Sequence, residues 1–251
     1  MELNRTQPEV LDEVQRLQSQ IPGLCYHDPH QSVSTGPLVR GCEICVRSYG
    51  KYLSFQLGFA CNAKCPFCFV ETYEPESRDP DEVYHRRALL KQFHRRKDEL
   101  EGVSLTGGEP LLYLPELEAC VSEMRAAKPA LHFWVFTNGI LADREHLHAL
   151  QMLGIQEIRF NLAATGYSEK TLENLARARE MFKYLVVEVP SYPEQKDALV
   201  GCLPELEHIG IDQLNLQELY ITAANAERLE GEGYQAGLLF AKKFFRTGVG
   251  R

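Results

Sequence analysis

Apolar positions along the chain follow two patterns that alternate from residue 51 onward. Short apolar runs predict strands, and longer stretches with apolar residues every three or four positions predict amphipathic helices. The predicted strands are residues 52–59, 103–106, 131–137, 157–162, 184–190 and 213–220. The predicted helices are residues 81–99, 114–126, 142–152, 168–182, 194–208 and 233–246.

Six strand–helix units with short connections predict an α/β fold, in which helices cover a mostly parallel sheet. Either a doubly wound sheet or a curved partial barrel satisfies this pattern. In both, chemistry takes place at the carboxyl ends of the strands. The conspicuous residues at or near those ends are Cys61, 107–109, 137–139, Asn161, Glu188 and 217–218.

The first fifty residues follow a different pattern. Helical spacing predicts one helix over residues 6–20, and a stretch rich in Gly, Pro, Ser and His follows it over residues 21–45. We therefore expect an N-terminal helical and loop extension over residues 1–50. Residues 51–251 then form the α/β domain, which ends in a helix.

Composition narrows the classes of function. The 251 residues, 44% of them hydrophobic, suffice for a sizeable core, and a formal charge of −8 argues against nonspecific nucleic-acid binding. The basic run at residues 85–97 fits a solvated helix face better than an RNA-binding one. No signal sequence and no long apolar segment is visible, which predicts a cytoplasmic protein outside the membrane. There, clustered cysteines favour metal binding over disulfides.

Three of the eight cysteines lie within eight residues, directly after the strand predicted at 52–59. They are Cys61, Cys65 and Cys68. Zinc knuckles typically pair two C-x2-C turns to complete four ligands, and a redox pair needs only two cysteines. Three thiolates on one short loop suit three corners of a 4Fe-4S cluster, which leaves the fourth iron open for a small chelating ligand.

This spacing, an aromatic residue before the last cysteine, and GGEP at residues 107–110 together resemble the radical S-adenosylmethionine (radical SAM) superfamily. The closest likeness is to members related to pyruvate formate-lyase activating enzyme, and it covers about residues 51–220. The resemblance implies a partial (β/α)6 TIM-like barrel that binds a 4Fe-4S cluster and S-adenosylmethionine. It also implies reductive cleavage of S-adenosylmethionine to a 5′-deoxyadenosyl radical, which abstracts hydrogen from a substrate.

The resemblance assigns roles by position. The implied cluster ligands are Cys61, Cys65 and Cys68. Phe67 is expected along the adenine, and Gly107 and Gly108 beside the methionine moiety, where no Cβ obstructs the backbone. Glu109 could accept a hydrogen bond from the ammonium group of that moiety.

Three further residues are candidates for binding S-adenosylmethionine or substrate. Asn161 is a candidate for the ribose hydroxyls and Asn138 for a polar contact near the methionine end. Either could instead be a turn residue that satisfies its own backbone. Glu188, among valines, needs a partner if it points inward, and could bind ribose or substrate.

A second group of candidate ligands lies upstream and consists of Cys25, Cys42 and Cys45. This group, with a nearby histidine, could hold zinc or a second iron–sulfur cluster, and some relatives of activating enzymes carry a similar GCxxC element before the first strand. Alternatively, these cysteines are small buried hydrophobic residues, as Cys120 is expected to be. Six histidines are interpreted as surface residues: His85, His94, His132, His146, His148 and His208.

We expect a radical SAM enzyme that acts on a peptide or protein, with reduced flavodoxin or ferredoxin as the electron donor that the resemblance implies. A small molecule, nucleotide or tRNA is the alternative substrate, and the negative charge disfavours nucleic acid without excluding it. About sixty residues precede the cysteine motif, whereas activating enzymes place it nearer the N-terminus. The alternative from another class is a noncatalytic metal-binding module, against which GGEP beside three cysteines argues.

Overall fold

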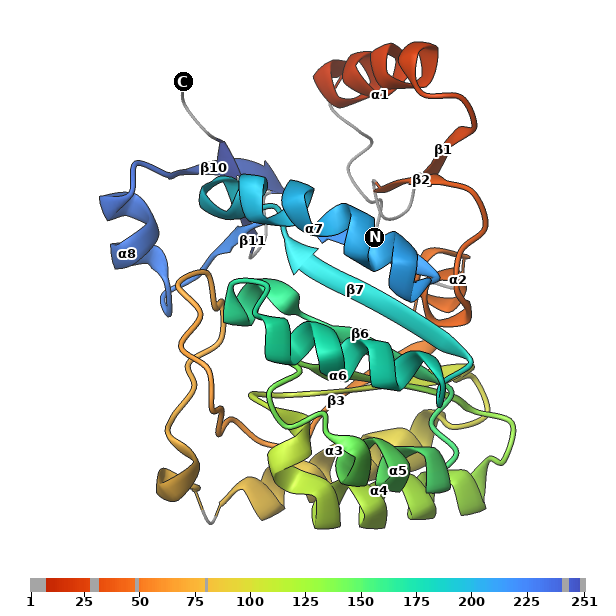
Figure 1. Ribbon diagram of the computed structural model, residues 1–251. Helices are drawn as coiled ribbons and strands as arrows, with labels where there is room; N and C mark the ends of the chain where they lie inside the picture. The colour runs from red at the N-terminus through yellow and green to blue at the C-terminus, as the bar shows by residue number, and fades with distance from the viewer. Residues whose placement is uncertain (1–7, 28–31, 48–49, 80, 241–243, 249–251) are drawn as a thin grey trace.

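The computed structural model of the chain describes residues 8–27, 32–47, 50–79, 81–240 and 244–248. A sheet of six parallel strands forms its centre, and helices pack along the sheet (Figure 1). Within the described ranges, no helix has both the length and the apolar composition needed to cross a lipid bilayer.

The six parallel strands pair in the order in which they occur in the chain. They are β3 (Tyr52–Gln56), β4 (Gly102–Thr106), β5 (His132–Thr137), β6 (Glu157–Phe160), β7 (Tyr184–Pro190) and β8 (Gln213–Gln217). The helices between them are α3 (Glu82–Arg96), α4 (Leu114–Ala127), α5 (Arg144–Met152), α6 (Glu169–Arg179) and α7 (Lys196–Ile209). Sequential parallel pairing, with β3 and β8 as edges, confirms the predicted α/β class and partial (β/α)6 barrel.

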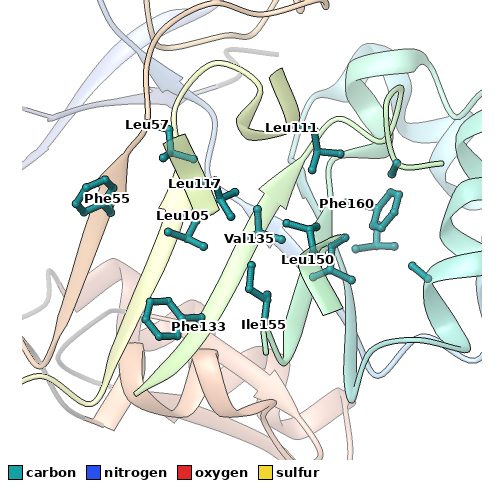
Figure 2. Close-up of a cluster of buried hydrophobic side chains, with 14 of the residues drawn as sticks. Phe55, Leu57, Leu105, Leu111, Leu117, Phe133, Val135, Leu150, Ile155 and Phe160 are labelled. Carbon is teal, nitrogen blue, oxygen red and sulfur yellow. The ribbon is translucent and has the colours of Figure 1, made fainter. Parts of the chain in front are cut away.

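The hydrophobic core lies between the sheet and its helices (Figure 2). Phe133 and Val135 on β5 and Phe160 on β6 have no exposed surface, and they share this core with Leu117 of α4 and Leu150 of α5. Because side chains alternate along a strand, the neighbouring positions face the inside of the barrel. That inner face carries the polar residues described below.

Short 3₁₀-helices continue several strands at the carboxyl edge of the sheet. η3 (Pro110–Tyr113) follows β4, η4 (Leu162–Thr165) follows β6 and η5 (Pro193–Gln195) follows β7, while η2 (Pro75–Ser77) lies between β3 and α3. Glu109 caps η3 by accepting the backbone N–H of Leu111. The cap of η3 thus holds the Glu109 side chain at the sheet edge, where it meets Thr137 at the end of β5.

The N-terminal region contains α1 (Pro8–Gln20), the hairpin strands β1 (Leu24–His27) and β2 (Ser32–Thr35), and α2 (Arg40–Arg47). The helix predicted over residues 6–20 is confirmed from residue 8, and residues 6 and 7 lie outside the described residues. The loop predicted over residues 21–45 also holds the hairpin and most of α2. An eight-residue helix is marginal by itself, so its contacts with β4 and β5 stabilise it. Ile44, which is 1% exposed, is buried in these contacts.

The C-terminal region consists of β9 (Tyr220–Ile221), α8 (Ala226–Gly231), β10 (Gln235–Phe240) and β11 (Phe244–Gly248), with β11 paired to both β9 and β10. The helix predicted over residues 233–246 was wrong for the described part of that range, which excludes residues 241–243. Gly237 weakens a helix, and the aromatic residues of this stretch favour strands. The strand predicted over residues 213–220 divides into β8 and the start of β9.

Candidate functional site

The carboxyl ends of the parallel strands place the sequence-predicted residues at one edge of the sheet. The cysteine segment follows β3, the turn at residues 107–109 follows β4, Asn138 follows β5 and Asn161 follows β6. Hydrogen bonds join the first three of these directly. Glu188 differs, because it lies inside β7 rather than after it.

Cys61, Cys65 and Cys68 are partly exposed and line the same open cavity, whose volume is about 1140 Å³. Several residues of the segment 223–231 also line it. Burial, together with the charges of Cys68 and Cys61, raises the pKa of the Cys65 thiol to about 12. The Cys65 thiol therefore stays protonated until a cation binds, and metal binding releases its proton.

The cysteine cavity fits a cluster better than a single metal ion. Across the part of the chain that the structure describes, no group of three or more His, Cys, Asp or Glu side chains is placed to hold one ion. A 4Fe-4S cluster makes a different demand, since each cysteine binds its own iron and the sulfurs lie further apart. Three thiols around one cavity match that donor set.

The two glycines after β4 allow the cysteine segment to approach closely. Gly107 has a φ of +142°, and a Cβ there would lie 2.3 Å from the Gly58 carbonyl oxygen. A Cβ on Gly108 would lie 2.2 Å from the Ala60 carbonyl oxygen. The Gly108 and Glu109 N–H groups donate to those same two oxygens, both at 2.9 Å. The glycines are thus needed for backbone contact with the cysteine segment, and their contact with methionine stays a prediction.

The Glu109 side chain is fully buried and ties the turn to the end of β5. Its carboxylate accepts the Asn138 N–H at 2.7 Å, the Thr137 hydroxyl at 2.9 Å and the Leu111 N–H at 3.1 Å. Burial raises the pKa of the Glu109 carboxyl to about 7, against these three donors, which favour the charged form. Most of its accepting capacity is used within the protein, so any bond to an ammonium group would be an additional one.

The two asparagines play different parts. Asn138 Oδ1 accepts the Ile140 N–H at 3.0 Å, as a turn residue does, while its Nδ2 donates to Asn62 at 2.7 Å in the cysteine loop. Asn161 Oδ1 is buried and has no hydrogen-bond partner. An orphaned buried acceptor is costly, so Asn161 is suited to a ligand that brings a donor such as a hydroxyl.

Phe67 packs inward rather than lining the cavity. Its ring is 5% exposed and meets Tyr192 edge to face, with 5.5 Å between ring centroids. Its carbonyl accepts the Asn225 side-chain amide at 3.1 Å. Asn225 therefore links the cysteine loop to the C-terminal segment. The contact between Phe67 and adenine stays a prediction.

Glu188 is paired on the inner face of the barrel. One of its oxygens accepts Arg159 Nη1 at 2.6 Å and Asn215 Nδ2 at 2.8 Å, and the other accepts Gln217 Nε2 at 2.7 Å. The partner that an inward carboxylate requires is therefore Arg159, which is 5% exposed. This pairing makes Glu188 a poor candidate for binding ribose.

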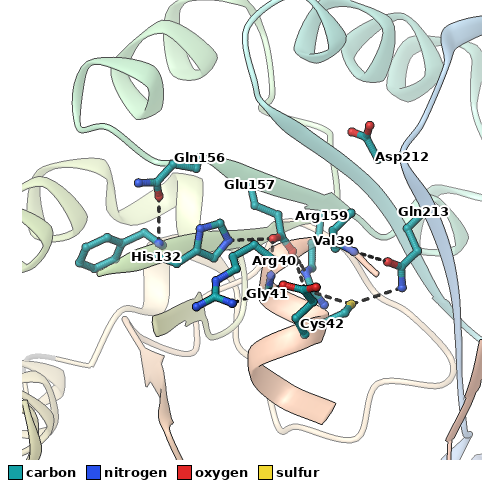
Figure 3. Close-up of polar contacts among 12 residues, drawn as sticks. Val39, Arg40, Gly41, Cys42, His132, Gln156, Glu157, Arg159, Asp212 and Gln213 are labelled. Carbon is teal, nitrogen blue, oxygen red and sulfur yellow. Dashed lines mark hydrogen bonds and ion pairs between the residues drawn. The ribbon is translucent and has the colours of Figure 1, made fainter. Parts of the chain in front are cut away.

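Arg159 continues this network to helix α2 (Figure 3). Its Nε donates to Glu157 at 2.7 Å, and Glu157 also accepts His132 Nε2 and the Gly41 N–H, both at 2.8 Å. The prediction that His132 lies on the surface was therefore wrong, because β5 directs it inward, where it is 8% exposed. Sequence reasoning missed Glu157 and Arg159, although two charged residues alternating in an apolar strand signal an occupied inner face.

The upstream cysteines are not gathered into one site. Cys42 is buried in α2, where its sulfur accepts N–H groups from Arg159, Gln213 and Asn215, each at 3.4 Å. Cys45 is partly exposed. Cys25 is exposed on β1, and its thiol donates to the carbonyl oxygen of Gly23. In the described ranges these three do not form a metal-binding group, so zinc or a second cluster here finds no support.

Comparison with known sequences identifies the family. The sequence profile of the Radical SAM superfamily matches residues 55–195, which is more than half of the chain. The chain belongs to the radical SAM superfamily. Radical SAM proteins use a 4Fe-4S cluster and S-adenosylmethionine, so membership implies both cofactors for the site just described.

Two curated relatives of this radical SAM chain differ in the function that they are named for. A Methanocaldococcus jannaschii protein, named as a candidate glycyl-radical enzyme activating enzyme, is 24% identical over 209 residues, covering 78% of this chain and 54% of that protein. The GTP 3′,8-cyclase of Chlorobaculum tepidum is 31% identical over 113 residues, covering 44% of this chain and 32% of that enzyme. The chain spans about half the length of these relatives or less.

Among solved structures, the complex of Streptococcus suis SuiB with S-adenosylmethionine superposes on this radical SAM chain with a TM-score of 0.50. The two are 16% identical, and the match covers 70% of this chain and 42% of SuiB. This likeness supports the partial barrel and says nothing about the substrate.

The described residues fit the two cofactors that radical SAM membership implies. Three thiols share one cavity, the glycine turn contacts the backbone just before Cys61, and the orphaned Asn161 oxygen follows β6 at the carboxyl edge of the same sheet. The residues that would hold the cluster are Cys61, Cys65 and Cys68. The residues that would contact S-adenosylmethionine are those of the turn at 107–109 and Asn161.

Proposed function

We propose that this chain is a radical SAM enzyme that binds its cluster through Cys61, Cys65 and Cys68 and removes a hydrogen atom from a peptide or protein. The observation that carries this proposal is the shared cavity of the three thiols, beside a glycine turn that bonds to the same loop. When bound, the cluster supplies the electron that cleaves S-adenosylmethionine into methionine and a 5′-deoxyadenosyl radical.

The chain's own residues bind and orient these groups. Gly107 and Gly108 let the turn lie directly against the cysteine segment, and the buried Glu109 fixes the turn against β5. Asn161 offers its unpaired oxygen to a ribose hydroxyl. A noncatalytic metal-binding module would need the cysteines but not this fixed turn and orphaned acceptor, which is why an enzyme is favoured.

A large substrate is supported by the open cavity. Its volume of about 1140 Å³ lies above the roughly 300–1,000 Å³ of typical small-molecule sites, and the cluster and S-adenosylmethionine would occupy part of it. The name of the M. jannaschii relative implies a protein substrate for that relative, which points the same way. The cyclase relative favours a nucleotide as the second candidate, over a shorter stretch of this chain.

The partners and location follow from the proposed chemistry. A cluster that must be reduced to a low potential needs a donor such as reduced flavodoxin or ferredoxin. Three reduced thiols are needed to hold the cluster, which a cytoplasmic setting maintains. The proposed electron donor and the proposed location both depend on the enzyme assignment, and both are refuted if that assignment is refuted.

Cleavage of S-adenosylmethionine tests the enzyme assignment without a known substrate. Anaerobically reconstituted protein, given dithionite and S-adenosylmethionine, is expected to release 5′-deoxyadenosine, measured by liquid chromatography with mass detection. Cys65→Ser is expected to release none, while Cys120→Ser, in a buried cysteine of α4, serves as the matched control. No release from wild-type protein with a fully loaded cluster would refute the proposal.

A further inference from the structure

A buried glutamate outside the cysteine motif lies at the start of α3. Glu82 is 5% exposed, and its Oε1 accepts the Phe59 N–H at 2.6 Å. The same oxygen accepts the hydroxyl of Tyr73 and, at 3.0 Å, that of Tyr113. The nearest cation is Arg86, at 3.8 Å from the other oxygen. Three donors converging on one oxygen offset much of the cost of burying this carboxylate.

These contacts hold the backbone that leads into Cys61. Glu82 fixes the Phe59 N–H, and the Tyr113 hydroxyl accepts the next N–H, that of Ala60, at 2.8 Å. Tyr73 closes the other side, because its carbonyl accepts the Cys61 N–H at 2.9 Å. Burial raises the pKa of the Tyr113 hydroxyl, which keeps it a donor to Glu82.

The backbone fixed by Glu82 is also the one that meets the glycine turn. The carbonyls of Gly58 and Ala60 accept the N–H groups of Gly108 and Glu109, both at 2.9 Å. Residues 58–60 are therefore held from one side by Glu82 and Tyr113, and from the other by residues 107–109. A shift of this segment would change the spacing between the cysteine loop and the turn.

We propose that Glu82, acting with Tyr73 and Tyr113, is a positioning residue that sets the spacing between the cysteine loop and the glycine turn. This inference rests on the proposed function, in which the loop binds the cluster and the turn binds S-adenosylmethionine. Glu82 touches neither loop cysteines nor turn by its own side chain, so it acts through residues 58–60. Glu82 is thus an additional functional residue, which neither the cysteine motif nor the glycine motif indicates.

The test compares two replacements of Glu82 in reconstituted full-length protein. Glu82→Leu removes the shared acceptor, and roughly tenfold weaker S-adenosylmethionine binding is expected in equilibrium dialysis, because three donors lose their partner. Glu82→Gln keeps an oxygen at that position and should bind within about threefold of wild type. The change that S-adenosylmethionine causes in the electron paramagnetic resonance spectrum of the reduced cluster should shrink in Glu82→Leu and persist in Glu82→Gln.

Controls separate this inference from the proposed function. Glu76→Leu alters an exposed glutamate in the same connection and should match wild type in both measurements. If wild type itself shows no response to S-adenosylmethionine, the proposed function fails. If wild type responds and a cluster-loaded Glu82→Leu responds equally, the positioning role is refuted. Should Glu82→Leu take up no iron, Tyr113→Phe, which frees the Ala60 N–H, decides by the same comparison.

Discussion

At the scale of single residues, the motif after β4 combines an interaction inside the protein with one expected toward a ligand. The sequence GGE predicted a turn that contacts S-adenosylmethionine, and its residue types are equally explained by contacts within the chain. The charge of Glu109 is visible in the sequence, but two of the three donors to its carboxylate, Thr137 and Asn138, lie about 30 residues downstream. Such partners cannot be inferred from local spacing.

Replacing Glu109 with glutamine should destabilise the fold. An amide can accept through only one atom, so its NH2 group would face a donor now served by the carboxylate. We expect Glu109→Gln to lower the free energy of unfolding by about 1–3 kcal/mol, measured by urea titration. Glu118→Gln, at an exposed position on α4, should change it by less than about 0.5 kcal/mol. Equal stability of Glu109→Gln and wild type would show that the buried bonds contribute little.

Gly108 should tolerate no side chain. Its Cβ would lie 2.2 Å from the Ala60 carbonyl oxygen, so Gly108→Ala must push the cysteine segment away. The expected loss is about 1–3 kcal/mol of unfolding free energy, with fewer clusters retained on reconstitution. Gly201→Ala is the matched control, because α7 leaves open space there, and it should gain up to about 1 kcal/mol. Chemical denaturation and iron analysis measure both effects. A Gly108→Ala variant with the stability and iron content of wild type would contradict this prediction.

At the scale of elements, the repeating strands and helices were predictable because the hydrophobic period is strong where a sheet packs on helices. Strand β7 matches its predicted range of 184–190, and helix α4 matches to within one residue. Helix α2 was missed because it depends on contacts with the inner face of the barrel, including the Gly41 N–H bond to Glu157. Short elements that tertiary contacts stabilise leave little periodic signal.

The inner-face network predicts how stability depends on pH. Burial opposes the charge on Glu157, yet His132, Arg159 and the Gly41 N–H hold the pKa of its carboxyl below the ordinary value. A carboxyl whose pKa is lowered by folding stabilises the protein above the unfolded pKa, and this contribution is lost as the pH falls through the folded pKa. Wild type should therefore lose stability below about pH 4.5.

Glu157→Gln isolates that contribution. The variant should be about 3 kcal/mol less stable at pH 7, because Arg159 loses one of its two carboxylate partners. Its unfolding free energy should also vary less between about pH 5 and pH 3, because the titrating group is gone. Glu180→Gln, at an exposed position after α6, should keep the wild-type pH profile. Parallel pH profiles for Glu157→Gln and wild type would contradict the assignment.

At the scale of the whole molecule, the parallel sheet is what made the site predictable. Once the strands were placed, their carboxyl ends had to converge, and residues after β3, β4 and β5 do bond to one another. Two features were not predictable: the cavity lining contributed by residues 223–231, and the hydrogen bond from Asn225 to the Phe67 carbonyl in the cysteine loop. They join segments more than 150 residues apart, and the sequence carries no local pattern for such contacts.

The metal content of the whole protein tests how many clusters it holds. We expect about four iron atoms per chain after anaerobic reconstitution and no zinc, because the described residues offer one cavity with three thiols. A Cys42→Ser, Cys45→Ser double variant should keep that count, and serine preserves an acceptor for the N–H groups around Cys42. Cys61→Ser should lose most of the iron. The double variant could instead lose iron or zinc while retaining its fold by circular dichroism. That result would show that the N-terminal cysteines hold a second metal, whose binding brings them together.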